Sequence, residues 1–189
     1  MRSKINKKVI RLMSFILVFV ISLSSTMVTN ASSFKKELIK VVSIANNNNY
    51  NNYVKDIENT TELLKSNCDN IFFTDENLNK KFNLNFDNCI VYAISFGKNI
   101  YIDTNYYNKN VVIHEMCHVY DYSNSWLSDS DDFQNLYKSE NSNISVSEGN
   151  SQNTYEFFAS SGEIFFNNPE KLKNLSYSTY SYFNEIFSN

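Results

Sequence analysis

The chain has 189 residues, a formal net charge of −3 and three cysteines, an odd number. Three cysteines are too few for a disulfide framework, and the acidic balance argues against a nucleic-acid partner because no basic surface is present to hold phosphates.

Residues 1–31 have the organisation of a secretory signal peptide. Five cations lead into an apolar run at residues 12–23, and a small-residue cleavage site follows at Thr29-Asn30-Ala31. Cleavage leaves residues 32–189 as one domain, secreted and without stable membrane association. An uncleaved membrane anchor is the alternative, since residues 12–29 are uncharged, although their serine- and threonine-rich second half favours cleavage.

The charge of the remaining chain narrows its partners. Five of the 17 Lys and Arg leave with the leader, so 12 remain against 20 Asp and Glu, a net charge of −8. Such a surface suits a neutral or basic substrate better than an acidic one. We expect a monomer. Cys68 and Cys89 either form one disulfide outside the cell or stay free.

The N-terminal part of the domain predicts two helices and a loop. In residues 34–45, apolar side chains recur at helical spacing, and the same holds for residues 53–67. The asparagine-rich residues 46–52 between them predict a loop.

The next stretch changes to strand patterns. Aromatic and β-branched runs at residues 71–74, 90–96 and 99–103 predict three strands. Gly97 lies between the last two, which therefore predict a hairpin. An extended peptide could add itself to the edge of such a sheet.

The C-terminal part is predicted to be helical. A short helix is expected over residues 131–140, a polar loop over 141–153, and an aromatic helix over 154–168 that is closed by Pro169. One or two helices follow over residues 170–187. The aromatic helix carries one polar stripe, which in isolation predicts a solvated face: Glu156, Ser160, Glu163 and Asn167.

The segment VVIHEMCHVYD at residues 111–121 contains both histidines of the chain. On a helix, His114 and His118 lie one turn apart on the same face and can bind one Zn²⁺ ion. Glu115 points about 100° away from His114, beside the metal, where a general base belongs. Cys117 falls on the apolar side and is expected to be a buried small residue.

A catalytic zinc takes three protein ligands and keeps one position for water. No histidine is left for the third ligand, so a carboxylate is expected, with a cysteine as the weaker alternative. Glu148, Glu156 and Glu163 are the candidates by position. Glu148 lies in the predicted loop, whereas the other two lie on the aromatic helix.

Four segments resemble, in order and spacing, the zinc-protease domain of anthrax lethal factor and the small secreted Pro-Pro endopeptidases: IFFTDENL, VYAISFGKNIYID, VIHEMCHVYD and YEFFAS. The resemblance begins near Asn70 and implies a zincin-like α+β fold, mostly helical, with a small sheet before the HExxH helix. It also implies Glu156 as the third zinc ligand, Glu115 as the base and a peptide or protein substrate that is proline-rich.

Two positions depart from the family pattern. Gly149 stands where the family has an oxyanion-stabilising tyrosine, and Ser160 stands where it has a second acid. Tyr137, residues 150–153 and Tyr155 could replace the tyrosine, with Tyr155 the weakest because it neighbours a ligand.

Asp121 matches a family aspartate on the histidine face. It is either an acceptor for a ligand histidine or an ordinary carboxylate at a helix end.

The sequence therefore predicts a secreted zinc metalloendopeptidase with Glu115, His114, His118 and Glu156 at its site. The alternative is an inactive zinc-binding homologue that grips a peptide without cutting it. A zinc-free structural domain is the weaker alternative.

Overall fold

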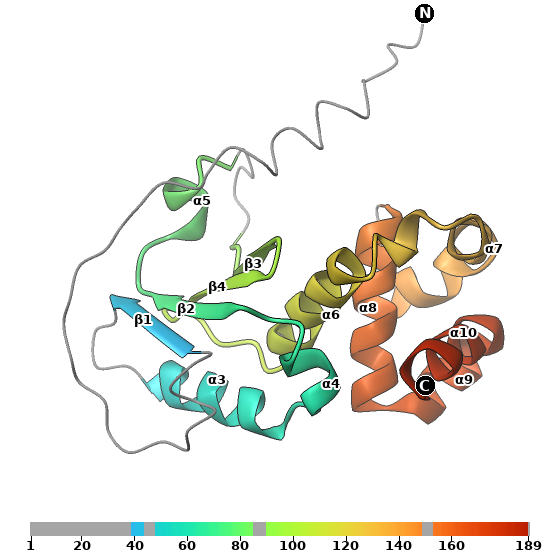
Figure 1. The fold of residues 1–189 in the computed structure, drawn as a ribbon, viewed down its shortest axis with the longest axis horizontal. Coiled ribbons are helices and arrows are strands. Elements are labelled where there is room, and N and C mark those ends of the chain that lie inside the picture. Colours follow the sequence, from blue (N-terminus) through green and yellow to red (C-terminus); the bar gives the residue numbers. More distant parts are fainter. Residues whose placement is uncertain (1–38, 44–47, 85–89, 149–152, 189) are drawn as a thin grey trace, which may run out of the picture.

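Four strands form one sheet in the order β1-β2-β4-β3, and helices occupy the rest of the computed structural model (Figure 1). The structure describes residues 39–43, 48–84, 90–148 and 153–188, so the leader at residues 1–31 lies outside the described residues. The described part is mostly helical with a small sheet before the HExxH helix, which confirms the α+β prediction. None of its helices has the length and apolar composition to cross a membrane.

The elements follow one another along the chain with these bounds. They are β1 (Ile39–Ser43), α3 (Asn48–Asn59), α4 (Glu62–Lys65), β2 (Asn70–Thr74), α5 (Leu78–Lys81), β3 (Ala93–Phe96), β4 (Asn99–Asp103), α6 (Val111–Ser123), a 3-10 turn (Leu127–Asp129), α7 (Asp131–Glu148), α8 (Thr154–Asn167), α9 (Pro169–Leu175) and α10 (Tyr177–Ser188).

The sheet mixes parallel and antiparallel pairs. β2 lies between β1 and β4 and is parallel to both, while β3 and β4 form the predicted antiparallel hairpin. Gly97 has φ of +58° in the hairpin turn, a conformation that glycine adopts without a Cβ penalty. Alternate residues of β2 and β4 are fully buried on one face of these two strands: Ile71, Phe73, Ile100 and Ile102.

The helix predicted over residues 34–45 is wrong where the structure describes it. Residues 39–43 form β1, which pairs in parallel with β2. Ile39, Val41 and Val42 are β-branched and favour a strand, and the exposed edge of β2 supplies hydrogen-bonding partners. The apolar residues of this segment fit both periods, so the spacing alone favoured the wrong one.

The loop predicted over residues 46–52 is wrong from Asn48 on, because α3 begins at that residue. Tyr50 packs its ring edge-on against Phe73 at 5.0 Å between centroids, and Tyr53 is fully buried. The Asn49 side chain donates to the carbonyl of Thr104 at 3.0 Å. These tertiary contacts stabilise a helix in a segment whose composition favours a loop.

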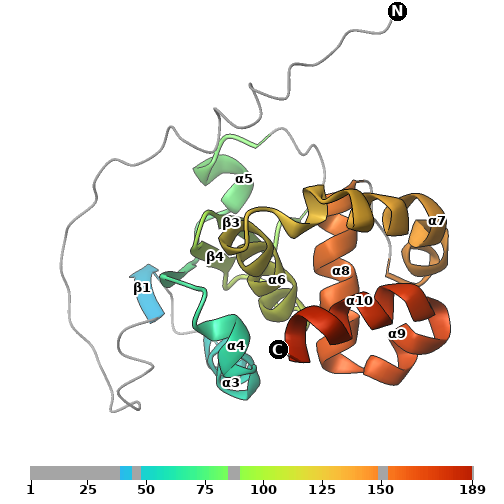
Figure 2. The ribbon, with the colours of Figure 1, turned by 45° about the vertical axis from the view of Figure 1, so that its right-hand side comes forward.

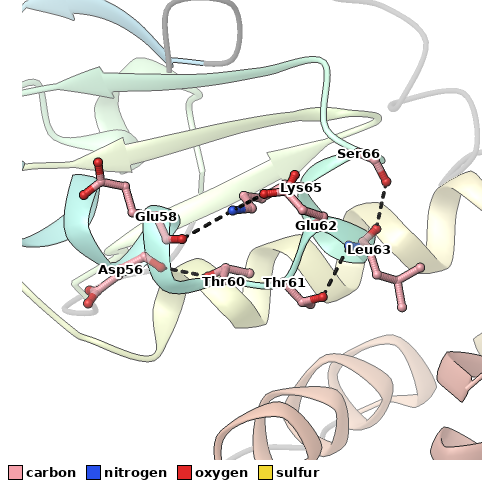
Figure 3. Close-up of polar contacts among 8 residues, drawn as sticks. All are labelled: Asp56, Glu58, Thr60, Thr61, Glu62, Leu63, Lys65 and Ser66. Atoms are coloured by element: carbon pink, nitrogen blue, oxygen red, sulfur yellow. Dashed lines mark hydrogen bonds and ion pairs between the residues drawn. The ribbon is translucent and has the colours of Figure 1, made fainter. Parts of the chain in front are cut away.

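The second predicted helix, residues 53–67, is broken at Thr60 and Thr61 (Figure 3). The Thr60 hydroxyl donates to the Asp56 carbonyl at 2.9 Å, and the Thr61 hydroxyl caps α4. The Lys65 ammonium, on a side chain that is nearly buried, lies 2.7 Å from Glu62 and donates to the carbonyl of residue 58. These contacts therefore stabilise the break between the two helices, after which the chain turns toward β2.

The C-terminal helices pack around aromatic side chains. Phe133 of α7 contacts Phe157 and Phe158 of α8, with ring centroids 5.5 Å and 5.1 Å apart, and Phe158 contacts Phe183 of α10 at 5.0 Å. The loop predicted over residues 141–153 is wrong up to Glu148, because α7 continues to that residue. Ile144 is fully buried and attaches the extra turns to the core.

The molecule has two halves, the sheet with α3 and α4 and the helical half with α7 to α10, and helix α6 lies between them (Figure 2). It packs against β3 and β4 on one side and against α8 on the other. This arrangement sets the histidine-bearing helix against the helix that carries Glu156.

Candidate metal centre

Helix α6 places the two histidines side by side. His114 and His118 are four residues apart, and their ring centroids lie 4.9 Å from each other with the rings nearly perpendicular. Both side chains are mostly buried, with 19% and 16% of their surface exposed. The helix thus presents two imidazoles to one small volume.

Helix α8 brings one carboxylate into that volume. Glu156 Oε2 lies 3.3 Å from His114 Nε2, and Glu156 Oε1 lies 3.5 Å from His118 Nε2. The Asn153 side chain caps α8 by accepting from the backbone N–H of Glu156, which fixes this residue in the first turn. The structure therefore brings together all three residues expected to bind zinc.

The donor set fits a zinc ion. One ligand atom from each of His114, His118 and Glu156 lies within 4.8 Å of the others. Ligand atoms about 2.0–2.1 Å from a tetrahedral zinc are about 3.3–3.4 Å apart. The two imidazoles lie 3.3 Å and 3.5 Å from different oxygens of Glu156, so the three side chains are near enough to share one ion. Two imidazoles and a carboxylate are also the ligand types of catalytic zinc sites that keep a position for water.

The electrostatics of the cluster favour a positive charge. Burial lowers the pKa of His114, but the carboxylates of Glu156 and Glu163 outweigh it and raise that pKa to about 10. Burial likewise raises the pKa of Glu156, but the two imidazoles outweigh it, and the net pKa is well below its usual range. A metal cation in the same place would meet the same attraction.

Glu115 follows His114 directly in α6. Its side chain is 7% exposed. Among the described residues, its carboxylate has no hydrogen bond or ion pair, and it adds to the negative field around His114. A nearly buried carboxylate without a structural partner beside two candidate ligands is suited to proton transfer.

The other candidate ligands have different positions. Glu163 lies near His114 but on its second nitrogen, with Oε2 3.4 Å from Nδ1. Glu148 is the last residue of α7, so it does not lie in the loop that the sequence predicted. Cys117 is buried as predicted, and burial raises the pKa of its thiol well above the usual range.

The polar stripe on α8 is a solvated face only in part, because Asn167 is exposed and the Glu156 side chain is 41% exposed, whereas its other two residues are mostly buried. The side chain of Glu163 is 15% exposed and Ser160 is 9% exposed, while Glu156 turns toward the histidines. Glu156 and Glu163 face α6, and imidazole groups across the interface compensate the burial of these two carboxylates.

Asp121 has a structural role in this arrangement. It is fully buried, and its two carboxylate oxygens accept from the backbone N–H of Ser128 at 2.8 Å and from the Ser128 hydroxyl at 2.5 Å. Within the described residues it accepts no hydrogen bond from His118. Asp121 thus holds the turn after α6, as a helix-end carboxylate does.

The structure describes some of the residues that could replace the tyrosine implied by the resemblance. Tyr155 donates its hydroxyl to Asp129 at 2.9 Å, which agrees with the expectation that it points away from the site. Tyr137 packs against Phe157. Gly149 and residues 150–152 lie outside the described residues, as does Cys89. Cys68 is a buried free thiol.

Comparison with known proteins adds no relative. No protein-family model matches the chain, and no curated protein does. The site is therefore interpreted from its own geometry.

Sequence reasoning missed the partner of Asp121 and the place of Glu163 beside His114. The seven-residue spacing of Glu156 and Glu163, two helical turns, was the available signal for the second. Nothing in the spacing of Asp121 and Ser128 indicated their pairing.

Proposed function

We propose that the chain is a secreted zinc-dependent endopeptidase with a zincin-like domain. The observation that carries the proposal is the cluster of His114, His118 and Glu156, whose ligand atoms lie within 4.8 Å of one another, with Glu115 directly after His114 in the chain. The resemblance of the HExxH and EFFA segments to the lethal factor and Pro-Pro endopeptidase domains supports the same reading.

The roles of the residues follow from their chemistry. His114, His118 and Glu156 would hold the ion, and bound zinc supplies a Lewis acid together with a water whose pKa falls toward about 7. The Glu115 carboxylate would take a proton from the attacking water and deliver it to the leaving amine. The substrate is a peptide or protein, and the resemblance implies proline-rich sites.

The sheet offers a place for an extended peptide. Within the described residues, β3 pairs with β4 alone, so its second edge is free. β3 also packs against α6. A peptide that adds to this edge would run past the histidines of α6, held by backbone hydrogen bonds.

Digestion of a proline-enriched peptide library by the purified protein, followed by mass spectrometry, tests this function. We expect cleavage by the zinc-loaded protein. Glu115→Gln should lose about 10²- to 10⁴-fold in rate while it retains zinc, since the substituted side chain is no ligand. Cleavage that survives this substitution would contradict the mechanism.

An inactive zinc-binding protein is the second candidate function. The observation that favours it is Gly149, in place of the tyrosine that stabilises the oxyanion in the family. The loss of one such donor costs about 10²- to 10³-fold in rate. Stoichiometric zinc and peptide binding, without a cleaved product, would establish this alternative.

A further inference from the structure

The His114 ring has a carboxylate of α8 at each nitrogen. Nε2 lies 3.3 Å from Glu156 Oε2, and Nδ1 lies 3.4 Å from Glu163 Oε2. Glu156 and Glu163 are seven residues apart and so lie on one face of α8, two turns from each other. His114 spans the gap between them.

The two nitrogens must do different things if His114 binds a metal. The ligand nitrogen offers a lone pair, so the other nitrogen carries the proton, and an acceptor for that proton fixes the tautomer and the ring orientation. Nε2 of His114 lies beside Glu156, which also contacts Nε2 of His118, whereas Nδ1 of His114 lies beside Glu163. If Nε2 binds the metal, Nδ1 carries the proton, and Glu163 Oε2 at 3.4 Å is placed to accept it.

We propose that Glu163 is a positioning residue that holds His114 with Nδ1 protonated and Nε2 directed at the metal. The proposal rests on the proposed zinc site. Glu163 is not an alternative third ligand, because it meets the opposite side of the ring from Glu156. The family pattern has its second acid at the position of Ser160, and Glu163 follows that position by three residues.

The packing of α8 on α6 makes this contact possible. Gly162 precedes Glu163, and a Cβ at this position would lie 2.7 Å from the Cys117 sulfur. The absence of a side chain therefore allows the two helices to approach closely, so that the Glu163 side chain can reach the His114 ring. Its carboxylate is mostly shielded from water, with 15% of the side chain exposed, which strengthens the interaction with a ring N–H.

Zinc affinity of purified Glu163→Ala and Glu163→Gln variants, measured by competition with a chromogenic chelator, tests the proposal. We expect Glu163→Ala to bind Zn²⁺ about 10- to 100-fold more weakly than the wild type. Glu163→Gln should lie between the two, since its amide oxygen can still accept from Nδ1–H. Glu170→Gln, at a well-exposed acid of α9 that carries the same charge, is the matched control and should not change the affinity.

A spectroscopic measurement separates positioning from general stability. In the Co²⁺-substituted protein, the visible ligand-field bands should shift in Glu163→Ala and stay unchanged in Glu170→Gln. Wild-type affinity and bands in Glu163→Ala, with zinc lost in Glu156→Ala, would overturn the role of Glu163 alone. If Glu163→Ala does not fold, wild-type affinity and bands in the isosteric Glu163→Gln variant overturn it. A wild-type protein that binds no Zn²⁺ would overturn the proposed function as well.

Discussion

At the scale of single residues, the contact between Gly162 and Cys117 sets how closely α8 approaches α6. A Cβ at Gly162 would lie 2.7 Å from the Cys117 sulfur and 3.3 Å from its Cβ. Both residues belong to the helix pair that carries the candidate ligands, so a small steric change there acts on the site as well as on the core.

We expect Gly162→Ala to destabilise the protein by about 1–3 kcal/mol, the usual cost of overpacking a filled core. The added methyl group must displace either the Cys117 side chain or α8 itself. Urea denaturation of the zinc-free protein measures the loss. In the Cys117→Ala background the nearest contact is gone, so the same substitution should cost less there. Equal costs in both backgrounds would show that the contact does not limit the helix spacing.

Asp121 allows a second prediction at this scale. Its removal leaves the buried Ser128 N–H without its acceptor, and such a group costs about 1–3 kcal/mol. Asp121→Ala should therefore lower the free energy of unfolding while its zinc affinity stays near that of the wild type. A loss of zinc affinity as large as in Glu163→Ala would instead indicate that Asp121 orients His118.

At the scale of elements, the free edge of β3 is the feature that relates the sheet to a peptide. The N–H of Asp103 donates to the Tyr92 carbonyl at 2.9 Å. Because hydrogen-bonded and non-bonded pairs alternate in an antiparallel ladder, Ile94 then pairs with β4, while the N–H and C=O groups of Ser95 point to the free edge.

This alternation predicts different effects of proline at two adjacent positions. Ser95→Pro removes an N–H that the sheet does not use, so the variant should fold, bind zinc and lose peptide cleavage. Ile94→Pro removes a ladder hydrogen bond and should lower the melting temperature. Circular dichroism and the peptide digest measure the two effects. Full cleavage by a folded Ser95→Pro variant would contradict substrate addition at this edge.

At the scale of the whole molecule, the sequence predicted well where a short pattern determines the outcome. The β3–β4 hairpin follows from aromatic and β-branched runs on either side of a turn glycine, and α8 from a long amphipathic pattern. It failed at β1 and at the start of α3, where pairing with β2 and contacts with Phe73 outweigh local preference. Residues His114 and His118 could be paired from spacing alone, whereas the two sides of the His114 ring required the packing of α6 on α8.

The last prediction concerns zinc and the stability of the whole chain. Helix α6 packs on the sheet and α8 belongs to the helical half, so an ion held by both joins the two halves. Ligand at about 100 times its dissociation constant stabilises the folded state by about 2.7 kcal/mol. For a chain of this size, that raises the melting temperature by about 5–10 °C. Thermal denaturation with and without Zn²⁺ measures the difference in melting temperature. The difference should vanish in Glu156→Ala and persist in Glu115→Gln, because Glu156 is an expected ligand of the ion and Glu115 is not. A melting temperature that does not respond to Zn²⁺ in the wild type would show that the cluster holds no metal in the folded protein.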